Sequence, residues 1–320
     1  MRVLLTGASS FTGMWLVLAL AKRGVEVVAA LRGDPRRYDA VRQARMTQVA
    51  AHAAVLPEAP MGSQALYDAA DRLGPFEGLV LHGAHVGDFK DPAYDAGRAV
   101  VANTAGLERL VVRLKANGLK RIVATGSVFE AGEGRGDGPL HHVGAYGFAK
   151  SMTWEILKET ADREAVDLAK FVIASPFGAY EKPGFVQELM RRWLAGETAY
   201  VRTPQVGRDW VPAPALAEAH ADMVAAAPPY PPLARLTPSF LPLTNGAFAA
   251  FLAREARSRL GRPCALRLAD PPEPPDGPLE RYGVDRLPDG DGQVLRDVLD
   301  GLVGWHQRLA ERKQGYSLIS

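Results

Sequence analysis

The first 24 residues most constrain the fold, because they join two apolar runs through a loop of glycine and hydroxyl residues: MRVLLTGASSFTGMWLVLALAKRG. The first run, "RVLLT", is short and ends at Gly7, which is typical of a buried parallel strand. The second run, "GMWLVLALAKRG", carries apolar residues at helical spacing and stops at Gly24, a usual helix end. The stretch therefore predicts a strand, a glycine turn and a helix.

A cleaved export signal is the alternative interpretation of the same residues, since an arginine stands near the start and the small residues "ALA" precede a charge. The apolar core of such a signal is continuous. Here "TGASSFTG" interrupts the core and leaves two runs that are each too short. Cys264 is the only cysteine, which excludes an intrachain disulfide and fits a reducing compartment. We therefore expect a cytoplasmic protein.

Size and charge exclude several classes of protein. The chain has 320 residues, enough to bury a large core, and its net charge is +2. No strong field of one sign indicates nucleic acid or a membrane surface as a partner. No stretch approaches the ~18 continuous apolar residues that span a bilayer. We expect a small-molecule substrate, and neither nucleic acid nor a membrane.

Strands and helices alternate along the first half of the chain. This order predicts right-handed crossovers and an α/β fold, a doubly wound parallel sheet (Rossmann fold) with ligands at the carboxyl ends of its strands. Besides the first strand, the predicted strands are 25–31, 77–83, 119–127 and 168–178, and the predicted helices are 13–24, 63–74, 96–118 and 145–165.

The pattern changes after about residue 175, where proline accumulates in "APPYPPLARLTP" and "PPEPPDGP". Residues 245–261 and 292–313 have the spacing of amphipathic helices. We predict an NAD(P)-binding domain over 1–174. Residues 175–320 are predicted to form mainly a smaller substrate-binding lobe, with some segments returning to the first sheet.

The loop "TGASSFTG" has the features of a phosphate-binding turn. Gly7 would make the tight turn and Gly13 would let the helix pack on the sheet, while the helix N-terminus offers free N–H groups to a pyrophosphate. Ser10 stands in the middle place, where glycine is usual. Its hydroxyl either donates to a phosphate or only fills the place. The alternative for the whole loop is a tight turn without a ligand.

The residue after the second strand indicates which dinucleotide binds. An NAD site has an acid there for the ribose hydroxyl, but the chain has Leu31 followed by Arg32. Arg32 would pair with a 2′-phosphate, assisted by Arg36, Arg37 and Ser9. The pattern favours NADP(H), with NAD(H) as the alternative. Arg32 would otherwise be a solvated arginine before a turn.

"AYGFAK" places Tyr146 and Lys150 on one face of a helix. An ammonium group near a phenol lowers its pKa, so Tyr146 would serve as a general acid or base while a hydride moves to or from the cofactor. Thr125 and Ser127, in "ATGSVF", would hold the substrate oxygen. The alternatives are an ordinary surface pair and turn hydroxyls.

With "TGASSFTG", "ATGSVF" and "AYGFAK" in the expected order, the chain resembles the extended short-chain dehydrogenases/reductases, and among them the NAD(P)-dependent sugar-nucleotide epimerase/dehydratase family. "VLHGAH", "NTAGLERLV", "SPFGAY" and "GRDWVP" stand where that family has further motifs. The resemblance implies a set of cofactor contacts. These are Gly7, Ser9, Ser10, Phe11, Thr12, Gly13, Arg32, His82, Gly83, Ala84, Asn103, Tyr146, Lys150, Ser175 and Phe177.

The resemblance also implies catalytic and substrate roles. Tyr146 and Lys150 match plainly, and the family's hydroxyl residue falls on Thr125, with Ser127 as the alternative two residues on. Arg208 would bind the substrate diphosphate. His85 and Lys90 are further substrate candidates, although ordinary loop residues are the alternative for both. The same alternative holds for His82 and for His141 and His142. No metal site is indicated.

Three departures concern the substrate. The Asp-Glu pair of sugar-nucleotide dehydratases is Gly126-Ser127 here, which argues against simple 4,6-dehydration. The arginine of the strand-six motif is Ser175, and no acid follows Arg208 and Asp209 until Glu218.

We therefore predict an NADP(H)-dependent oxidoreductase or epimerase that acts on a keto or hydroxy carbon of a nucleotide-linked sugar. The alternatives are a reductase of small non-nucleotide ketones or aldehydes, like dihydroflavonol reductases, and a non-catalytic NADP-binding sensor. By analogy with the family, we expect a homodimer formed through the helices that carry Asn103 and Tyr146.

Overall fold

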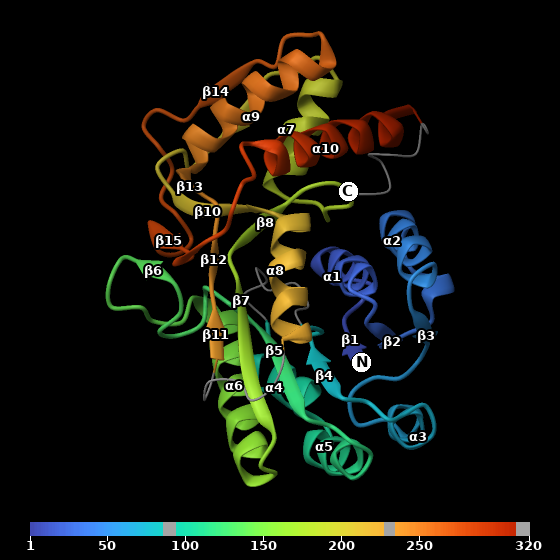
Figure 1. The fold of residues 1–320 in the computed structure, drawn as a ribbon. Helices are drawn as coiled ribbons and strands as arrows, with labels where there is room; N and C mark the ends of the chain where they lie inside the picture. The colour runs from blue at the N-terminus through green and yellow to red at the C-terminus, as the bar shows by residue number, and fades with distance from the viewer. Residues whose placement is uncertain (86–93, 227–233, 312–320) are drawn as a thin grey trace.

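The computed structural model describes residues 1–85, 94–226 and 234–311, and its main feature within them is a parallel sheet of seven strands (Figure 1). The spatial order is β11-β7-β5-β4-β1-β2-β3, and every neighbouring pair is parallel. The strands are β1 (Arg2–Thr6), β2 (Glu26–Ala30), β3 (Ala54–Leu56), β4 (Gly78–Leu81), β5 (Arg121–Ser127), β7 (Asp167–Ile173) and β11 (Ala234–Leu236). The predicted doubly wound α/β fold is confirmed.

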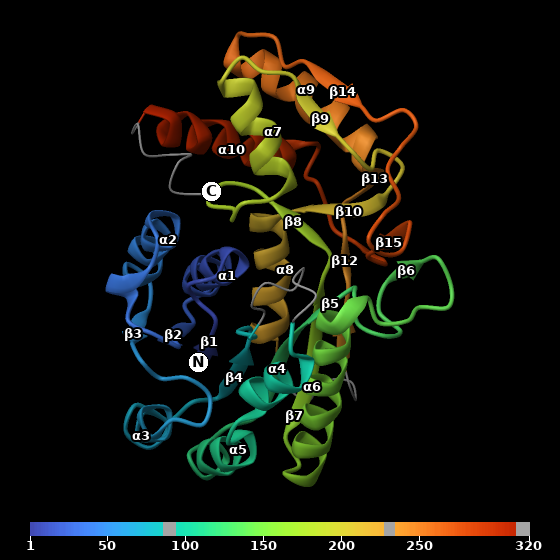
Figure 2. The same ribbon diagram turned by 180° about the vertical axis from the view of Figure 1, so that it is seen from behind.

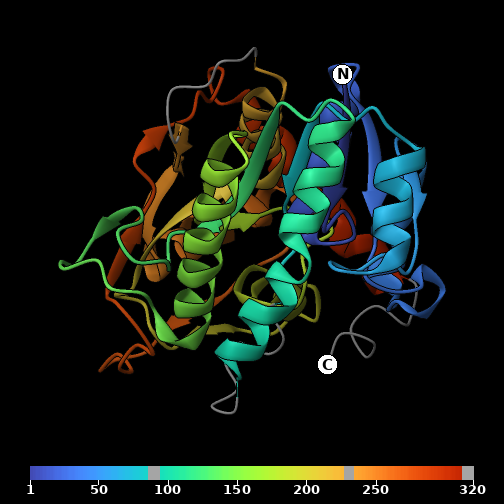
Figure 3. The same ribbon diagram turned by 90° about the horizontal axis from the view of Figure 1, so that it is seen from below.

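Helices cover both faces of this sheet, as Figure 3 shows from below. One apolar layer joins the sheet to α1 (Phe11–Lys22), α2 (Ala40–Ala50) and α8 (Ala213–Ala225). The opposite layer joins it to α3 (Gln64–Arg72), α5 (Leu107–Ala116) and α6 (Gly144–Arg163), with α4 (Ala96–Thr104) beside α6. Because both faces are covered, β1, β2 and β4 are almost entirely apolar rather than alternating. β5 and β7 also carry the buried polar residues Thr125, Ser127 and Lys170.

A smaller lobe lies beyond the carboxyl ends of the strands (Figures 1 and 2). Its sheet contains β6 (Arg135–Gly136), β8 (Ser175–Phe177), β10 (Gly207–Pro212), β13 (Leu241–Thr244) and β15 (Glu280–Tyr282). Its apolar core packs against α7 (Phe185–Leu194), α9 (Asn245–Leu260) and α10 (Gln293–Glu311). Short pairs also form, β9 (Ala199–Val201) with β14 (Leu266–Leu268) and β12 (Pro238–Ser239) with β16 (Asp285–Arg286), and η1 (Pro35–Arg37) is a 3₁₀ turn.

The two parts of the chain interleave. β11 comes from the second half of the sequence but pairs with β7 at the edge of the large sheet, and α8 packs on α1. The boundary predicted at residue 174 falls immediately before β8. Within the described residues, no helix is both long and apolar enough to cross a membrane.

The helix predicted over 96–118 is wrong in one respect, because it is two helices, α4 and α5. Gly106 separates them with a positive φ of 59°, a conformation that costs little only for glycine. A side chain at this position would collide with the hydroxyl of Tyr67 on α3. Apolar periodicity runs through the break, so it gave no sign of the bend. The short edge strand β3 also went unpredicted, and the strand expected over 168–178 is divided into β7 and β8.

Candidate active site

The nucleotide loop lies at the carboxyl ends of β1 and β4, where the two backbones approach closely. A Cβ atom on Gly7 would stand 2.5 Å from the backbone nitrogen of Gly83, and Gly7 has a φ of 80°. Both positions therefore require glycine if the loops are to pack together. Helix α1 begins at this contact, and its first turn carries no acidic residue. A free helix N-terminus at a strand end suits the pyrophosphate of a dinucleotide.

Ser10 is the N-cap of α1. Its Oγ accepts a hydrogen bond from the backbone N–H of Gly13 at 3.0 Å, which satisfies one of the free donors of the first turn. A Cβ at Gly13 would collide with the carbonyl oxygen of Gly7. The serine in the middle of the loop thus has a structural role that glycine could not perform.

Two arginines stand beside the loop on the side of the second strand. Arg32 is exposed and its Nη1 lies 3.1 Å from Nδ1 of His85. Arg42, on α2, donates to Oγ of Ser9 from Nη2 and Nε at 2.7 and 3.1 Å, and its guanidinium lies over the Tyr38 ring at 3.9 Å. Arg42 went unnoticed in the sequence. The only signal was its place in the first turn of the helix that follows Arg32.

The other predicted basic residues are engaged differently. Arg36 pairs with Asp34 at 2.8 Å within the same turn, and Arg37 is exposed. Leu31 is buried, so no carboxylate occupies the end of β2. The basic character of this side of the loop therefore comes from Arg32 and Arg42.

Tyr146 and Lys150 lie on the first two turns of α6, beside the end of β5. The Tyr146 phenol is hydrogen-bonded to the side chain of Ser127, the last residue of β5. Lys150 donates from Nζ to the carbonyl oxygen of Thr125. The structure thus brings together a phenol, a hydroxyl and an ammonium group, which is the set that proton transfer at a carbonyl oxygen requires.

The side chain of Thr125 is hydrogen-bonded to a histidine. Its Oγ1 lies 2.9 Å from Nδ1 of His82, and Nε2 of the same ring lies 2.9 Å from Oγ1 of Thr12. His82 is buried, and burial, followed by the charge of Lys150, lowers its pKa to about 3. His82 is therefore neutral and links the nucleotide loop to β5. This geometry favours Ser127 over Thr125, which the sequence placed first, as the partner of Tyr146.

His220 on α8 completes this buried layer and also went unpredicted. Its ring stacks on Phe171 at 4.1 Å and lies 5.7 Å from the His82 ring. Burial, together with His82, lowers the pKa of His220 well below its usual value. Both imidazoles are therefore neutral, and their rings pack in the core beneath the site.

Burial dominates the electrostatics of Tyr146. Burial, followed by the charge of the Glu130 carboxylate, raises the pKa of Tyr146 to about 12, although the bond from Ser127 lowers it. Burial also lowers the pKa of Lys150. The lowering of the Tyr146 pKa by Lys150 stays a prediction, and burial and Glu130 act in the opposite direction. At neutral pH the phenol is protonated and positioned as an acid.

Asn103 joins the loop after β4 to α6. Its Oδ1 accepts from the backbone N–H of His85 at 2.6 Å, and its Nδ2 donates to Oγ1 of Thr153 at 3.4 Å. Ala84 precedes His85 in this loop. The asparagine therefore holds the loop that faces the cofactor side.

Several other predicted contacts lie at the edges of the site. The rings of Phe11 and Phe177 are buried, and Phe177 lies wholly in the core of the smaller lobe, so only its backbone is left for a ligand. Ser175 begins β8 beside Trp210 of β10. His142 packs against Phe148 at 5.3 Å. Lys90 lies outside the described residues.

Arg208 lies on β10 above Phe129, at 5.8 Å from its ring. Its guanidinium donates to the carbonyl oxygens of Gly207, Leu279 and Pro278 at 2.6, 3.3 and 3.2 Å. The register of β10 and β15 places Arg281 directly beside it. Arg208 therefore has a second, unpredicted guanidinium as its neighbour.

Arg281 is 2% exposed and donates from Nη2 to the carbonyl oxygen of His141 at 3.3 Å. Its Nε and Nη1 have no hydrogen-bond partner among the described residues. Burial, followed by Arg281, lowers the pKa of Arg208. The Asp137 carboxylate lies near enough to oppose the lowering of the pKa at both Arg208 and Arg281. One carboxylate beside two guanidiniums leaves a net positive charge, which favours an anion. Glu218, the first acid after Asp209, is instead paired with Arg23 and Lys22 of α1.

A family model described as "NAD dependent epimerase/dehydratase family" matches residues 3–230 of the chain. No curated protein matches it.

Solved structures of low sequence identity share the fold over nearly the whole chain. UDP-glucuronic acid 4-epimerase from Bacillus cereus has a TM-score of 0.75 at 13% identity, with 97% of this chain and 100% of that chain covered. dTDP-glucose 4,6-dehydratase from Streptomyces venezuelae has a TM-score of 0.75 at 18% identity, with 99% and 100% covered. UDP-glucose 4-epimerase from Thermotoga maritima has a TM-score of 0.72 at 17% identity, with 97% and 100% covered.

The capping role of Ser10 can be separated from phosphate binding. We expect Ser10→Ala to lower the free energy of unfolding by about 1 kcal/mol, the usual cost of a lost N-cap, and to leave NADPH affinity nearly unchanged. Ser63→Ala is the matched control, because Ser63 caps α3 in the same way, with 3.2 Å to the N–H of Leu66, outside the site. Urea unfolding and fluorescence titration measure the two effects. A loss of about tenfold in NADPH affinity, the size of one hydrogen bond, would assign the hydroxyl to a phosphate.

Proposed function

The chain belongs to the NAD-dependent epimerase/dehydratase family, and we propose that it transfers a hydride between a nicotinamide dinucleotide and a keto or hydroxy carbon of a nucleotide-linked sugar. The observation that carries this proposal is the hydrogen bond between Tyr146 and Ser127, with Lys150 one turn along the same helix. This group lies at the strand ends beside the nucleotide loop. A non-catalytic sensor would have no need of it.

Each residue of the set has a role in moving one proton. Ser127 holds the substrate oxygen beside the phenol, and Tyr146 gives a proton to that oxygen in reduction or takes it in oxidation. Lys150 supplies a positive charge and donors for the cofactor ribose. The nicotinamide, when bound, supplies or accepts the hydride. A protonated Tyr146 suits the reducing direction, because the phenol then has a proton to give to the substrate oxygen.

The basic side of the nucleotide loop supports NADP(H) as the cofactor. Arg32 and Arg42 flank the end of β2, where Leu31 stands in place of an acid. A 2′-phosphate would accept charge-assisted hydrogen bonds from both guanidiniums. The Bacillus cereus and Streptomyces venezuelae enzymes were solved with NAD, which remains the alternative.

Two neighbouring guanidiniums support a nucleoside diphosphate as the substrate handle. Arg208 and Arg281 lie on paired strands at the base of the smaller lobe. The Bacillus cereus epimerase was solved with a UDP-sugar. Gly126 stands where sugar-nucleotide dehydratases have the aspartate of their Asp-Glu pair, which argues against 4,6-dehydration. The position also has little room for a side chain, because a Cβ there would stand 2.6 Å from Cε of Lys170 and 3.1 Å from Oε1 of Glu130. Epimerisation and reduction remain the candidate outcomes.

One observation favours a second candidate, the reductase of small non-nucleotide carbonyls. Arg208 already donates to three backbone carbonyl oxygens, so its guanidinium is partly satisfied without a ligand. A small carbonyl substrate would need only the Tyr146 set and no anion site. Binding of a nucleoside diphosphate decides between the two candidates.

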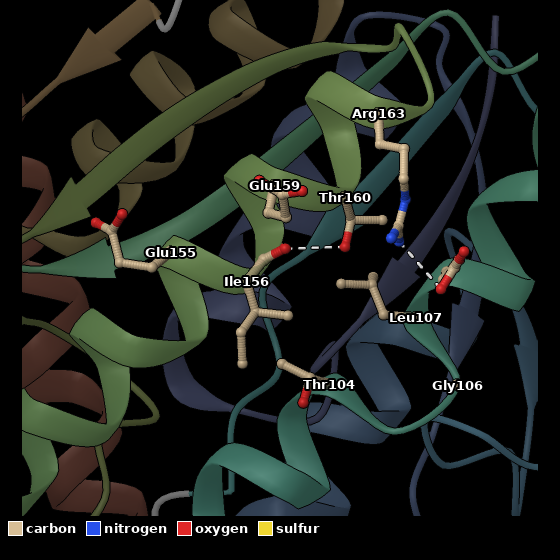
Figure 4. Close-up of a pocket in the computed structure, with 9 residues that line it drawn as sticks. Thr104, Gly106, Leu107, Glu155, Ile156, Glu159, Thr160 and Arg163 are labelled. Carbon is tan, nitrogen blue, oxygen red and sulfur yellow. Dashed lines mark hydrogen bonds and ion pairs between the residues drawn. The ribbon is translucent and has the colours of Figure 1, made fainter.

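We further propose a homodimer formed through α4 and α6. Phe148, Met152 and Ile156 stand four residues apart along α6 and are 37–40% exposed, and Val101 on α4 is 69% exposed. A shallow groove continues this surface along α6 and the start of α5 (Figure 4). Its rim carries the ion pair of Arg163 with Glu108 at 3.0 Å. An exposed apolar stripe with a charged rim is typical of a protein interface.

The acid–base assignment is tested with Tyr146→Phe, which removes the proton but keeps the ring. We expect turnover of a UDP-, GDP-, CDP- or dTDP-sugar panel to fall about 10²- to 10⁴-fold, because general acid–base catalysis contributes that much. Tyr67→Phe is the control, since its hydroxyl contacts only the carbonyl of Gly106 at 3.4 Å. Full activity in Tyr146→Phe would refute the assignment.

Cofactor choice is tested by dissociation constants for NADPH and NADH. We expect tighter binding of NADPH, and a loss of about 10- to 100-fold for NADPH alone in Arg42→Ala or Arg32→Ala, the size of a hydrogen bond to a charged group. Arg36→Ala is the matched control, because Arg36 is held by Asp34. A clear preference for NADH would contradict the NADP proposal.

The anion site is tested by calorimetry with UDP, GDP, CDP and dTDP. We expect one of them to bind, and Arg281→Met to weaken that binding about 10-fold or more while the free nucleoside is unaffected. Arg135→Met is the control, since Arg135 lies on the neighbouring β6 and is stacked on Tyr282 at 4.9 Å. Absence of binding by all four nucleotides would favour the small-carbonyl reductase.

A further inference from the structure

Three charged side chains are buried together behind the end of β5. Glu130, Glu133 and Lys170 are 1%, 2% and 2% exposed. Nζ of Lys170, in the middle of β7, lies 2.5 Å from Oε2 of Glu130 and 2.6 Å from Oε1 of Glu133. The ammonium also faces the ring of Trp154 on α6 at 4.6 Å. Removing these charges from water costs several kcal/mol per ion. A protein with apolar residues of similar size in place of a buried ion pair is often at least as stable. Stability alone is therefore a weak reason for this cluster.

Glu130 holds the backbone of Ser127 on both sides. Its Oε1 accepts from the N–H of Ser127 at 2.8 Å, and its own N–H donates to the carbonyl oxygen of Ser127 at 3.0 Å. The charged acceptor makes the first bond stronger than one between neutral groups. Gly126 leaves the space that the carboxylate and the Lys170 chain fill. The last residue of β5 is thus fixed from the side opposite its hydroxyl.

The same turn docks the start of α6. The N–H of Phe129 donates to Oγ of Ser127 at 3.2 Å, and the carbonyl oxygen of Phe129 accepts from the N–H of Val143 at 2.8 Å. A Cβ on Gly147 would collide with this carbonyl oxygen. The Tyr146 phenol, in that first turn, is hydrogen-bonded to Ser127. A continuous chain of contacts therefore leads from Glu130 to the phenol.

We propose that Glu130 is a positioning residue of the acid–base site, which holds Ser127 from behind and thereby orients the phenol of Tyr146. Lys170 is the buried cation that pairs with the Glu130 carboxylate, and Glu133 shares that cation. This inference rests on the proposed function of Tyr146. The cluster has no direct contact with a substrate, so Glu130 acts through Ser127.

The charge of Glu130 also reaches the proton-carrying groups. It raises the pKa of Tyr146, second to burial, and it opposes the lowering of the Lys150 pKa by burial. Loss of this negative charge therefore lowers the Tyr146 pKa. The charged or titratable groups that face the carboxylate or the phenol from the packed elements are Lys150 on α6, Lys170 on β7, Glu133, Arg235 on β11 at 3.5 Å from Glu133, and Tyr94.

The decisive comparison is Glu130→Gln against Glu133→Gln, measured on the full chain without substrate. Both variants take one carboxylate from Lys170, but only the first touches Ser127. NMR of ¹³Cζ-labelled tyrosine, with the Tyr146 signal assigned by its loss in Tyr146→Phe, follows the phenol as pH rises. We expect the apparent pKa of Tyr146 to fall by about one unit or more in Glu130→Gln, the usual effect of a nearby charge, and to stay unchanged in Glu133→Gln.

A second variant separates position from charge. Glu130→Asp keeps the negative charge but is one methylene too short to reach Ser127, so we expect faster amide hydrogen exchange at Ser127 with a nearly unchanged Tyr146 pKa. If the phenol titrates identically in Glu130→Gln and Glu133→Gln, or if Ser127 stays protected in Glu130→Asp, the proposal is overturned. Should Glu130→Gln fail to fold, Glu130→Asp carries the test alone, because it keeps the charge beside Lys170 and its hydrogen exchange at Ser127 decides the contact.

These measurements need no turnover, so they separate two kinds of failure. If the Tyr146 pKa falls as expected in Glu130→Gln but no sugar nucleotide of the panel is turned over, the proposed function fails and the positioning role of Glu130 stands. If a sugar nucleotide is turned over but the Tyr146 pKa does not fall, only the positioning role is overturned. Once a substrate is found, we expect Glu130→Gln to lower kcat more than it changes KM. The part of the pH–rate profile that reports the titration of Tyr146 is expected to move toward lower pH.

Discussion

The site depends on the close approach of the loops that follow β1 and β4. Only hydrogen atoms at Gly7 and Gly83 let the two backbones pack this tightly, since a Cβ on Gly7 would stand 2.5 Å from a backbone nitrogen. The contact allows His82 to reach Thr12 on one side and Thr125 on the other. The glycine loop after β1 and the end of β5 are thereby held as one unit. Preorganisation of this kind is what catalysis by positioning requires.

Burial outweighs local charge in setting the protonation states. The proximity of Tyr146 to Lys150 in the sequence predicts an easily ionised phenol, whereas burial raises the pKa of the phenol and lowers the pKa of the lysine. A sequence shows that two groups are four residues apart on a helix. It does not show how much water remains around them, and desolvation is the larger effect here. Tyr146 thus starts as a proton donor.

The smaller lobe is built by long-range strand pairing. β8, β10 and β15 form one sheet from segments separated by many residues. That pairing brings Arg281 beside Arg208, although 73 positions separate them in the sequence. Proline-rich segments in this part of the chain also obscure the periodicity of its strands and helices. Long-range pairing also returns β11 to the large sheet. Such contacts leave no local signature.

The sequence by itself determined the doubly wound fold, the glycine loop after β1 and the helix that carries Tyr146 and Lys150 four residues apart, because period, glycine turns and helical spacing are local properties. The break at Gly106, the contact of Thr125 with His82, and the positions of Arg42 and Arg281 were decided only by the tertiary structure. Each depends on a neighbour from a distant segment, as Thr125 depends on His82. Packing and burial act between elements, so they decide which of several plausible side chains faces the substrate.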